Sequence, residues 1–405
     1  MAVSAGVRIV SVGAPVASGG HPEAVALATT LGTAGLRVSA HVVVDDDEIA
    51  LEGMLDVPGV VAVVASVGGS AGDSVRRVLA RVTGARLKLH ERMRAGLEAH
   101  YAKRDRPLPR SAERLTLLPQ GATVADGAEP VWTLETAKTA WVVFLRDGLA
   151  SAVEGVLVPL ARERLGARGA VSVRTFKTAG VSAEEIEDRL VDRLDVGDVT
   201  LATVPGDGEV WVRLRARGRT PAAATKRLTD VAATLDTLLG DDCYGHDGDT
   251  LEAVVGRHLR ARNLTLAVAE SCTGGLVGHR ITGIPGSSAY FERGVLVYSD
   301  QAKQEMLGVD EAILRTHGAV SAPCAEAMAR GVCARSGAAC GLAITGIAGP
   351  DGGTPTKMVG TVFIGLAFKG DVAARRFRFD GDRASVKWQS SVMALDMLRR
   401  RLQAV

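Results

Sequence analysis

A glycine-rich turn between two apolar segments constrains the fold of this chain most strongly. The segment AESCTGG, residues 269–275, follows the apolar run 264–269 and precedes the apolar run 276–281. A strand that enters such a turn and then a helix predicts an α/β sheet with Ser271 at its carboxyl edge, next to the N–H groups of a helix N-terminus. Anions and reacting carbonyl groups are held at such edges, so we predict that Ser271 is a nucleophile.

The first 165 residues alternate short apolar segments with helical patterns. We expect strands at residues 8–12, 38–44, 60–65 and 141–145, and helices at residues 23–34, 73–82, 90–103 and 149–164. Strands that alternate with amphipathic helices indicate a parallel sheet covered by helices.

A shorter block follows, in which glycine, aspartate and proline separate the elements. We expect a strand after residue 170, a helix at 182–194, strands at 198–204 and 209–216, and a helix at 222–238. The sequence PGDG at 205–208 is typical of a hairpin turn, so the block reads as a small α+β module. The polar, glycine-rich stretch 240–249 is predicted to be a linker.

The last part of the chain again has an α/β pattern. We expect helices at residues 250–262, 275–281, 301–307, 322–336 and 383–402, and strands at 264–269, 294–298, 340–345, 359–367 and 373–379. A length of 405 residues fits two or three domains at roughly 150 residues each. The predicted fold class is α/β, with domains at residues 1–168, 169–240 and 241–405.

The charge balance disfavours nucleic acid as a partner. Lysine and arginine number 48 against 46 aspartate and glutamate, and the few aromatic residues are scattered, so no basic, aromatic-laced surface is expected. The five cysteines are odd in number, form no Cys-x-x-Cys pair and have no histidines at the spacing of zinc ligands. We therefore expect a reducing, cytoplasmic location, no metal, and no membrane-spanning or signal segment.

Ser271 needs a group that takes its proton, and Lys303 is the candidate. Lys303 lies in the run VYSDQAK, just after a predicted strand that ends at Tyr298, so two neighbouring strands would deliver serine and lysine to one sheet edge. A buried lysine near other cations can be uncharged near neutral pH and act as a base. The alternative is that Lys303 is an ordinary solvated helix residue.

Two further segments are candidate binding sites. In AITGIAGPDGG, residues 343–353, a strand ends at Thr345 and Gly346, where small residues admit a ligand to the backbone. In FDGDR, residues 379–383, Asp382 is a plausible N-cap and Arg383 works against the helix dipole, which favours contact with an anion. The alternatives are a plain strand-to-helix turn and an exposed arginine.

Other nucleophiles and bases are weaker candidates. Cys272 is adjacent to Ser271, but neighbouring residues leaving a strand face opposite ways, and free cysteine is commonly buried. His279 and His317 have no evident carboxylate partner, which favours core or surface roles.

The ordered motifs AESCTGG, GSSAYFERGVLVYSDQAK, HGAVS, ITGIAGPDGG, GTV and GDR over residues 250–402 closely resemble the C-terminal domain of the competence/damage-inducible CinA family. The resemblance implies an amidohydrolase that converts nicotinamide mononucleotide to nicotinate mononucleotide and ammonia without a metal or other cofactor. It also implies that Ser271 is the nucleophile and Lys303 its proton acceptor.

The same resemblance assigns supporting roles in the site. Tyr298, Thr345, Gly346 and Arg383 would support catalysis or bind substrate. The turn residues Thr273, Gly274 and Gly275 would supply backbone donors. Asp300 stands where the family usually has asparagine, and this like charge would weaken affinity for a phosphate-bearing ligand.

The order of the three blocks is also similar to full-length members of this family, in which the first domain is a molybdopterin-binding-like (MoaB/MogA-like) α/β/α domain. Active members use that domain to cleave ADP-ribose with a divalent metal. Here the Gly-Asp-Glu of the family is replaced by Gly13-Ala14-Pro15, and SVGGSAGD retains only Asp73 of an acidic pair. The Pro-Gly-Val-Pro turn appears as residues 146–149, RDGL. We expect this domain to be a scaffold or dimerisation element, because one carboxylate holds such a metal poorly.

Two alternatives to the amidohydrolase remain at this point. The first domain could still be the main, metal-dependent pyrophosphatase, or the protein could be a non-catalytic binding protein of competence or DNA repair. The resemblance and the frequency of symmetric dimers lead us to expect a homodimer.

Overall fold

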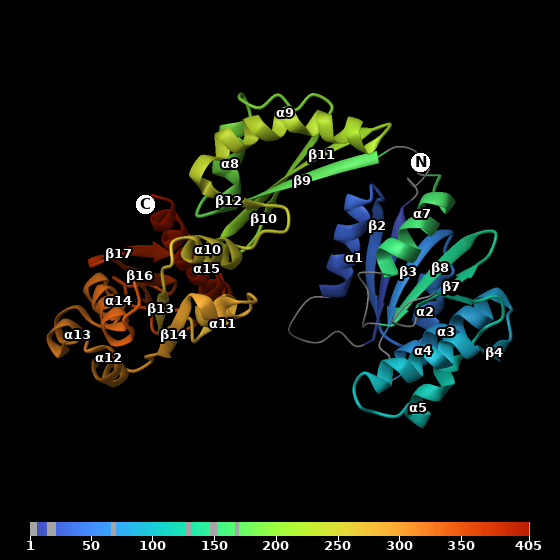
Figure 1. The fold of residues 1–405 in the computed structure, drawn as a ribbon, viewed down its shortest axis with the longest axis horizontal. Helices are drawn as coiled ribbons and strands as arrows, with labels where there is room; N and C mark the ends of the chain where they lie inside the picture. The colour runs from blue at the N-terminus through green and yellow to red at the C-terminus, as the bar shows by residue number, and fades with distance from the viewer. Residues whose placement is uncertain are drawn as a thin grey trace. The chain divides into compact units, whose positions relative to one another are not determined.

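The computed structural model describes residues 6–13, 22–65, 70–125, 131–145, 152–166 and 170–404 (Figure 1). The chain divides into two compact units, Met1–Val173 with Ala216–Arg227, and Arg174–Arg215 with Leu228–Val405. The three-domain division expected from the sequence stays a prediction.

The first unit contains a six-stranded sheet in the order β2-β1-β3-β8-β7-β6. Its parallel strands are β2 (Val38–Val44), β1 (Val7–Val12), β3 (Gly59–Ala65) and β8 (Thr139–Leu145). The parallel arrangement predicted for these four strands is confirmed, and two strands that the sequence pattern did not predict, β7 (Val131–Glu135) and β6 (Thr123–Val124), extend the sheet in antiparallel orientation. A tight turn, in which the Thr136 N–H donates to the Thr139 carbonyl at 2.8 Å, joins β7 to β8 and leaves no room for a crossover helix.

Helices cover both faces of this sheet, because alternate strand residues point to opposite sides. Val61 and Val63 pack with α2 (Glu48–Leu55), α3 (Ala71–Thr83) and α4 (Glu91–Ala102). Val60 and Ala62 pack with α1 (Pro22–Thr33) and with the segment formed by the π-helical Val153–Leu157 and α7 (Val158–Arg164). The first residues of the helix expected at 149–164 lie outside the described residues. The short elements α5 (Arg110–Glu113), β4 (Leu87–Leu89) and β5 (Leu117–Pro119) complete the unit, with β4 and β5 pairing as a second small sheet.

A four-stranded sheet has the order β10-β11-β9-β12. It contains β9 (Ala170–Ala179), β10 (Thr200–Pro205), β11 (Glu209–Gly218) and β12 (Cys243–His246), with helices α8 (Ala183–Leu190) and α9 (Pro221–Leu239). The predicted hairpin at 205–208 is confirmed, since β10 pairs antiparallel with β11 and the Gly206 N–H donates to the Glu209 carbonyl at 2.9 Å.

The linker expected at residues 240–249 was a wrong prediction. This stretch contains β12, which pairs antiparallel with β9 and buries Tyr244, whose hydroxyl donates to the Glu209 carboxylate at 2.8 Å. Glycine and aspartate dominate the composition of the stretch, so its sequence does not show the pattern of a strand with a buried aromatic residue.

The remaining sheet has the order β14-β13-β15-β16-β17. The strands β14 (Phe291–Leu296), β13 (Leu266–Glu270) and β15 (Cys340–Gly346) are parallel, and β16 (Thr361–Phe368) and β17 (Asp371–Arg378) are antiparallel. One apolar layer packs α10 (Leu251–Ala261), α11 (Leu276–Thr282) and α15 (Arg383–Gln403) on this sheet. The opposite layer contains α12 (Asp300–Leu307), α13 (Glu311–His317) and α14 (Ala322–Ser336). Figure 1 shows these helices around the strands, and α13 is the helix that the sequence pattern did not predict.

Across the part of the chain that the structure describes, no helix combines the length and apolar character needed to cross a membrane.

Candidate functional site

Strand β13 places Ser271 at the carboxyl edge of the sheet. All five strand residues are buried, and β13 lies between β14 and β15. The pairing with β15 continues one residue past the strand, because the Ser271 N–H donates to the Ile344 carbonyl at 3.0 Å. The Ser271 side chain is therefore held by a rigid backbone and is 8% exposed.

Helix α12 delivers Lys303 to Ser271. The hydroxyl of Ser299 caps this helix by accepting the Ala302 N–H at 3.1 Å, which fixes the first turn. Lys303 is 1% exposed, and its Nζ lies 3.3 Å from Ser271 Oγ. Nζ also donates to the carbonyls of Val297 at 2.9 Å and Tyr298 at 3.4 Å. Among the described residues Lys303 forms no ion pair, so its amine is surrounded by neutral oxygen atoms.

The turn after Ser271 has its own hydrogen bonds. Gly274 and Gly275 have φ angles of 63° and 92°, which glycine adopts at no steric cost. The Gly274 N–H donates to the Ser271 carbonyl at 3.1 Å and the Gly275 N–H to Glu270 Oε2 at 3.0 Å. These two expected backbone donors are thus already engaged within the turn.

Two other N–H groups of the turn are not bonded to any other described residue. That of Thr273 has no acceptor there, and that of Cys272 lies only against the thiol of its own side chain. Thr273 is fully buried, and its Oγ1 also has no partner there. Of the three turn residues expected to donate, Thr273 is the one whose N–H is not used by the protein.

Glu270 is a buried residue of the site that the sequence analysis missed. Its carboxylate is 2% exposed and accepts the N–H groups of Gly275 at 3.0 Å, Val277 at 3.2 Å and Gly278 at 2.8 Å. An acidic side chain stabilises the positive end of a helix, so Glu270 fixes the start of α11 against the end of β13. The sequence signal was an acidic residue immediately before a glycine turn that opens a helix.

Thr345 and Gly346 are both engaged by the protein. Thr345 is 1% exposed and its hydroxyl donates to the Ala319 carbonyl at 2.8 Å, so only its lone pairs are available to a ligand. A Cβ added to Gly346 would lie 2.7 Å from a side-chain carbon of Val362. Close packing against β16 therefore explains this glycine without a ligand.

Arg383 and Tyr298 lie side by side at the surface. Asp382 caps α15 as predicted, with its carboxylate accepting the Ser385 N–H at 2.8 Å. The Arg383 guanidinium donates to the Gly349 carbonyl at 2.7 Å and to the Tyr298 hydroxyl at 2.9 Å. Tyr298 is 64% exposed. Through these two bonds Arg383 joins the segments of Tyr298, Gly349 and Arg383, which the sequence analysis considered separately.

A cavity of about 580 Å³ adjoins these residues. Its lining includes Gly349, Val359, Arg383 and Lys387. Lys387 approaches the turn after Ser271, because a Cβ built on Gly274 would lie 3.4 Å from its Nζ. Two cationic side chains of α15 therefore line this cavity, and one of them, Lys387, which was not predicted, also lies next to the glycine turn.

The high pKa of its thiol makes Cys272 a weaker candidate for the nucleophile than Ser271. Desolvation raises the pKa of the Cys272 thiol to about 12, and the residue is 5% exposed. The thiolate is the reactive form of cysteine, so this thiol is inert near neutral pH.

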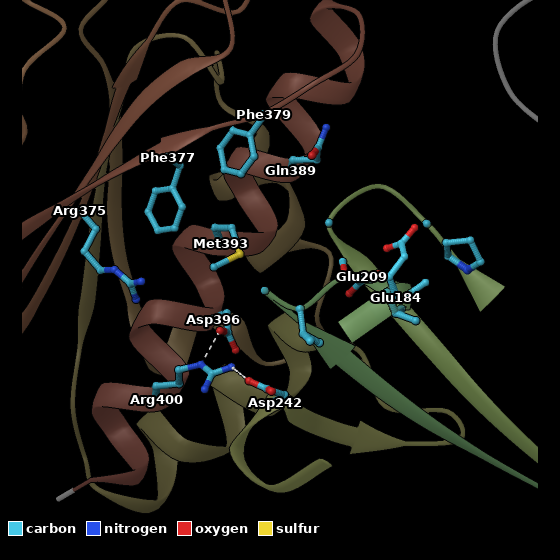
Figure 2. Close-up of a pocket in the computed structure, with 18 residues that line it drawn as sticks. Glu184, Glu209, Asp242, Arg375, Phe377, Phe379, Gln389, Met393, Asp396 and Arg400 are labelled. Atoms are coloured by element: carbon cyan, nitrogen blue, oxygen red, sulfur yellow. Dashed lines mark hydrogen bonds and ion pairs between the residues drawn. The ribbon is translucent and has the colours of Figure 1, made fainter. Parts of the chain in front are cut away.

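A second cavity, of about 680 Å³, does not include Ser271 among the residues that line it (Figure 2). Figure 2 shows Met393, Asp396 and Arg400 along α15, with Arg400 linked to Asp396 at 2.7 Å and to Asp242 at 2.8 Å. Ser182 is the hydroxyl-bearing side chain in its lining, and it caps α8 by accepting the Glu185 N–H at 3.1 Å. This cavity has no free hydroxyl comparable to that of Ser271.

The first unit does not offer the carboxylates of a divalent metal site in its described part. Asp73 is 6% exposed and forms ion pairs with Arg76, with Arg77 at 3.6 Å and with Arg114 at 3.7 Å. Three guanidinium groups occupy the space that a cation would need, so this residue does not fit the metal that the resemblance implies. Residues 14, 15, 66–69 and 146–149 of the expected eroded motifs lie outside the described residues.

Comparison with known families gives two matches. The CinA C-terminal domain matches residues 248–402, and the KH domain of the damage-inducible protein CinA matches residues 173–245. A crystal structure of a competence-damaged protein (CinA) superfamily member from Klebsiella pneumoniae is 36% identical, covering 38% of this chain and 97% of that one with a TM-score of 0.38.

Relatives extend over almost the whole chain. A curated protein of Moorella thermoacetica is 39% identical over 396 residues, which are 95% of each chain. A CinA-like protein of Gemmatimonas aurantiaca is 37% identical over 388 residues, 92% of this chain and 90% of the relative. The chain therefore belongs to the CinA family.

Proposed function

We propose that this protein hydrolyses the carboxamide of nicotinamide mononucleotide to nicotinate mononucleotide and ammonia, with Ser271 as nucleophile and Lys303 as general base. The observation that carries the proposal is the 3.3 Å separation of Ser271 Oγ and Lys303 Nζ, both buried. A nucleophile and its base within hydrogen-bond reach are the signature of covalent catalysis by a serine hydroxyl.

Lys303 can accept the Ser271 proton when its amine is uncharged. The amine is buried, and the atoms within hydrogen-bond distance of it are neutral oxygen atoms. The two N–H groups of an uncharged amine can donate to the carbonyls of Val297 and Tyr298, which leaves its lone pair for the Ser271 hydroxyl.

The reaction then proceeds in two acyl transfers. Ser271 Oγ bonds to the carboxamide carbon while its proton passes to Lys303 Nζ, and Lys303 returns that proton to the nitrogen as the C–N bond breaks and ammonia leaves. Water attacks the acyl-enzyme in the same way, with Lys303 accepting its proton, and the acid is released as the Ser271 hydroxyl forms again.

The N–H groups of Cys272 and Thr273 are the candidates to stabilise the oxyanion of each tetrahedral intermediate. Deletion of one such donor costs about 3 to 4 kcal/mol where it has been measured. Arg383 and Lys387, which line the adjoining cavity, are the candidates to bind the substrate's phosphate. The pyridinium ring of the substrate withdraws electrons from the carbonyl group and makes it a better electrophile.

The test is ammonia release from nicotinamide mononucleotide, with nicotinate mononucleotide identified as the co-product. Ser271→Ala should abolish turnover, whereas Ser336→Ala, which removes a hydroxyl bonded within α14, should leave it unchanged. Equal ammonia release by the native protein and Ser271→Ala would refute the nucleophile. No ammonia release from the native protein would refute the activity itself.

A further inference from the structure

Three potential metal ligands meet at the junction of α9 and β12, on residues that the proposed reaction does not use. Asp236 lies on α9, and Cys243 and His246 are the first and last residues of β12. Their side-chain donor atoms all lie within 4.8 Å of one another. His246 Nε2 is 3.0 Å from Asp236 Oδ1 and 4.0 Å from Cys243 Sγ.

A β-bulge brings the cysteine and the histidine together. In a regular strand, residues three apart point to opposite faces. The register shifts within β12, where Cys243 pairs with Thr178 but Gly245 pairs with Lys177 and His246 with Phe176. The extra residue, Tyr244, restores Cys243 and His246 to the same face of the sheet, which is a recognised use of such bulges.

The backbone between the two ligands is held rigidly. The His246 N–H donates to Asp249 Oδ2 at 3.0 Å, and a Cβ on Gly245 would lie 2.7 Å from the Cβ of Asp249. The His246 ring packs edge-on against Phe176, with 5.0 Å between ring centroids. These contacts fix the ring orientation before any ion binds, which favours metal affinity.

The three residues do not have the geometry of a catalytic triad. In a triad the carboxylate and the nucleophile contact different nitrogen atoms of the imidazole ring. Here Asp236 and Cys243 both approach Nε2, so the three donor atoms converge on a common point instead of forming a relay.

We propose that Asp236, Cys243 and His246 bind one divalent transition-metal ion, with Zn²⁺ as the best fit and water in the fourth position. Thiolate, imidazole and carboxylate are the three ligand types of protein zinc sites, at about 2.3, 2.0 and 2.0 to 2.2 Å from the ion. Tetrahedral coordination at these lengths separates donor atoms by roughly 3.2 to 3.7 Å. The observed separations are 3.0 and 4.0 Å for the two pairs with His246 and at most 4.8 Å for Asp236 and Cys243, so the side chains must close in by up to about 1 Å around the ion. The side chain of Asp236 is 50% exposed, so a bound ion would be accessible to solvent.

Metal binding would also change the state of the thiol. Burial raises the pKa of the Cys243 thiol above its ordinary value. A coordinated thiol loses its proton, so the ion would hold Cys243 as the thiolate.

The test titrates the full-length protein with Zn²⁺ by calorimetry and with Co²⁺ by absorption. Native protein should bind one ion per chain, and bound Co²⁺ should show a thiolate-to-metal charge-transfer band. Cys243→Ser and His246→Asn should each weaken binding at least tenfold and remove or reduce that band. Cys333→Ser, which changes a half-buried cysteine of α14, should behave as the native protein.

Asp236→Asn is the variant least able to disturb folding, because its side chain is half exposed, and it should also bind more weakly. Circular dichroism verifies that each variant is folded. Failure of the folded native protein to bind Zn²⁺ would overturn the proposal, and so would equal affinities of Cys243→Ser or Asp236→Asn and the native protein.

Discussion

The carboxylate of Glu270, the last residue of β13, accepts the backbone N–H of Gly278 in α11 at 2.8 Å. The same carboxylate accepts the N–H groups of Gly275 and Val277, so one buried side chain ties the strand before Ser271 to the helix after it. The position of the Ser271 hydroxyl depends on this connection.

Glu270→Ala should destabilise the fold and slow catalysis. Three N–H donors would lose a charged acceptor, and unsatisfied buried donors cost about 1 to 3 kcal/mol each, so we expect a loss of about 3 kcal/mol or more. Urea unfolding followed by circular dichroism measures the loss, and kcat at a temperature where the variant is folded measures the displacement of Ser271. Glu311→Gln, an exposed residue at the start of α13, is the control. If Glu270→Ala had the same free energy of unfolding as the native protein, the three hydrogen bonds would contribute little to stability.

The Cys272 thiol should resist alkylation in the folded protein. Its pKa is about 12, so at pH 8 the reactive thiolate is a very small fraction. Iodoacetamide at pH 8, followed by peptide mass spectrometry, should modify Cys272 only after denaturation, and ammonia release should persist in the treated folded protein. Rapid labelling of Cys272 with loss of activity would reopen the choice between cysteine and serine.

Arg383→Ala should weaken substrate binding more than chemistry. Its guanidinium lines the cavity at the start of α15 and donates to the Gly349 carbonyl and the Tyr298 hydroxyl. We expect KM for nicotinamide mononucleotide to increase about tenfold or more, as for the loss of a charge-assisted bond, with a smaller effect on kcat. The effect should be absent with nicotinamide riboside, which has no phosphate. Equal effects on both substrates would assign Arg383 to positioning of the loop.

The first unit should not cleave ADP-ribose when Mg²⁺ or Mn²⁺ is added. The Asp73 carboxylate is paired with Arg76, Arg77 and Arg114 instead of facing open space. Chromatography of the nucleotides after long incubation should show intact ADP-ribose in the native protein and in Asp73→Asn. Metal-dependent cleavage that Asp73→Asn abolishes would establish the pyrophosphatase as a real activity.

Much of the fold could be predicted because the apolar periodicity of the chain is strong. The helix at 322–336 and the strand at 38–44 have the predicted bounds, and the buried strand β13 was predicted from the apolar residues that precede Glu270. The hairpin at 205–208 was predicted because its glycines and proline carry a specific turn geometry.

The features that were missed depend on long-range pairing. Strand β12 is a polar, glycine-rich segment that becomes a strand because β9 offers it a partner. Its bulge, which places Cys243 and His246 on one face, has no local signal, so the spacing of cysteines and histidines in the sequence leads to the expectation of no metal. Glu270 likewise gains its role from the turn that folds back over it.

The pairing of Ser271 with Lys303 could be predicted because it depends only on which strands are neighbours in the sheet. Ser271 and Lys303 follow β13 and β14, which are parallel neighbours, so their separation in sequence disappears at the sheet edge. The hydrogen bonds that engage Gly274, Gly275 and Thr345 depend on the exact course of the turns, which residue types do not specify.

The most direct test of the central claim is the steady-state rate of ammonia release by Lys303→Ala at saturating nicotinamide mononucleotide. The native protein and Lys226→Ala, which changes an exposed lysine of α9, are measured beside it. General-base catalysis contributes about 10² to 10⁴-fold, so the account predicts a fall in kcat of roughly 10³-fold with Lys226→Ala unchanged. A kcat of folded Lys303→Ala close to the native value would contradict the serine–lysine mechanism.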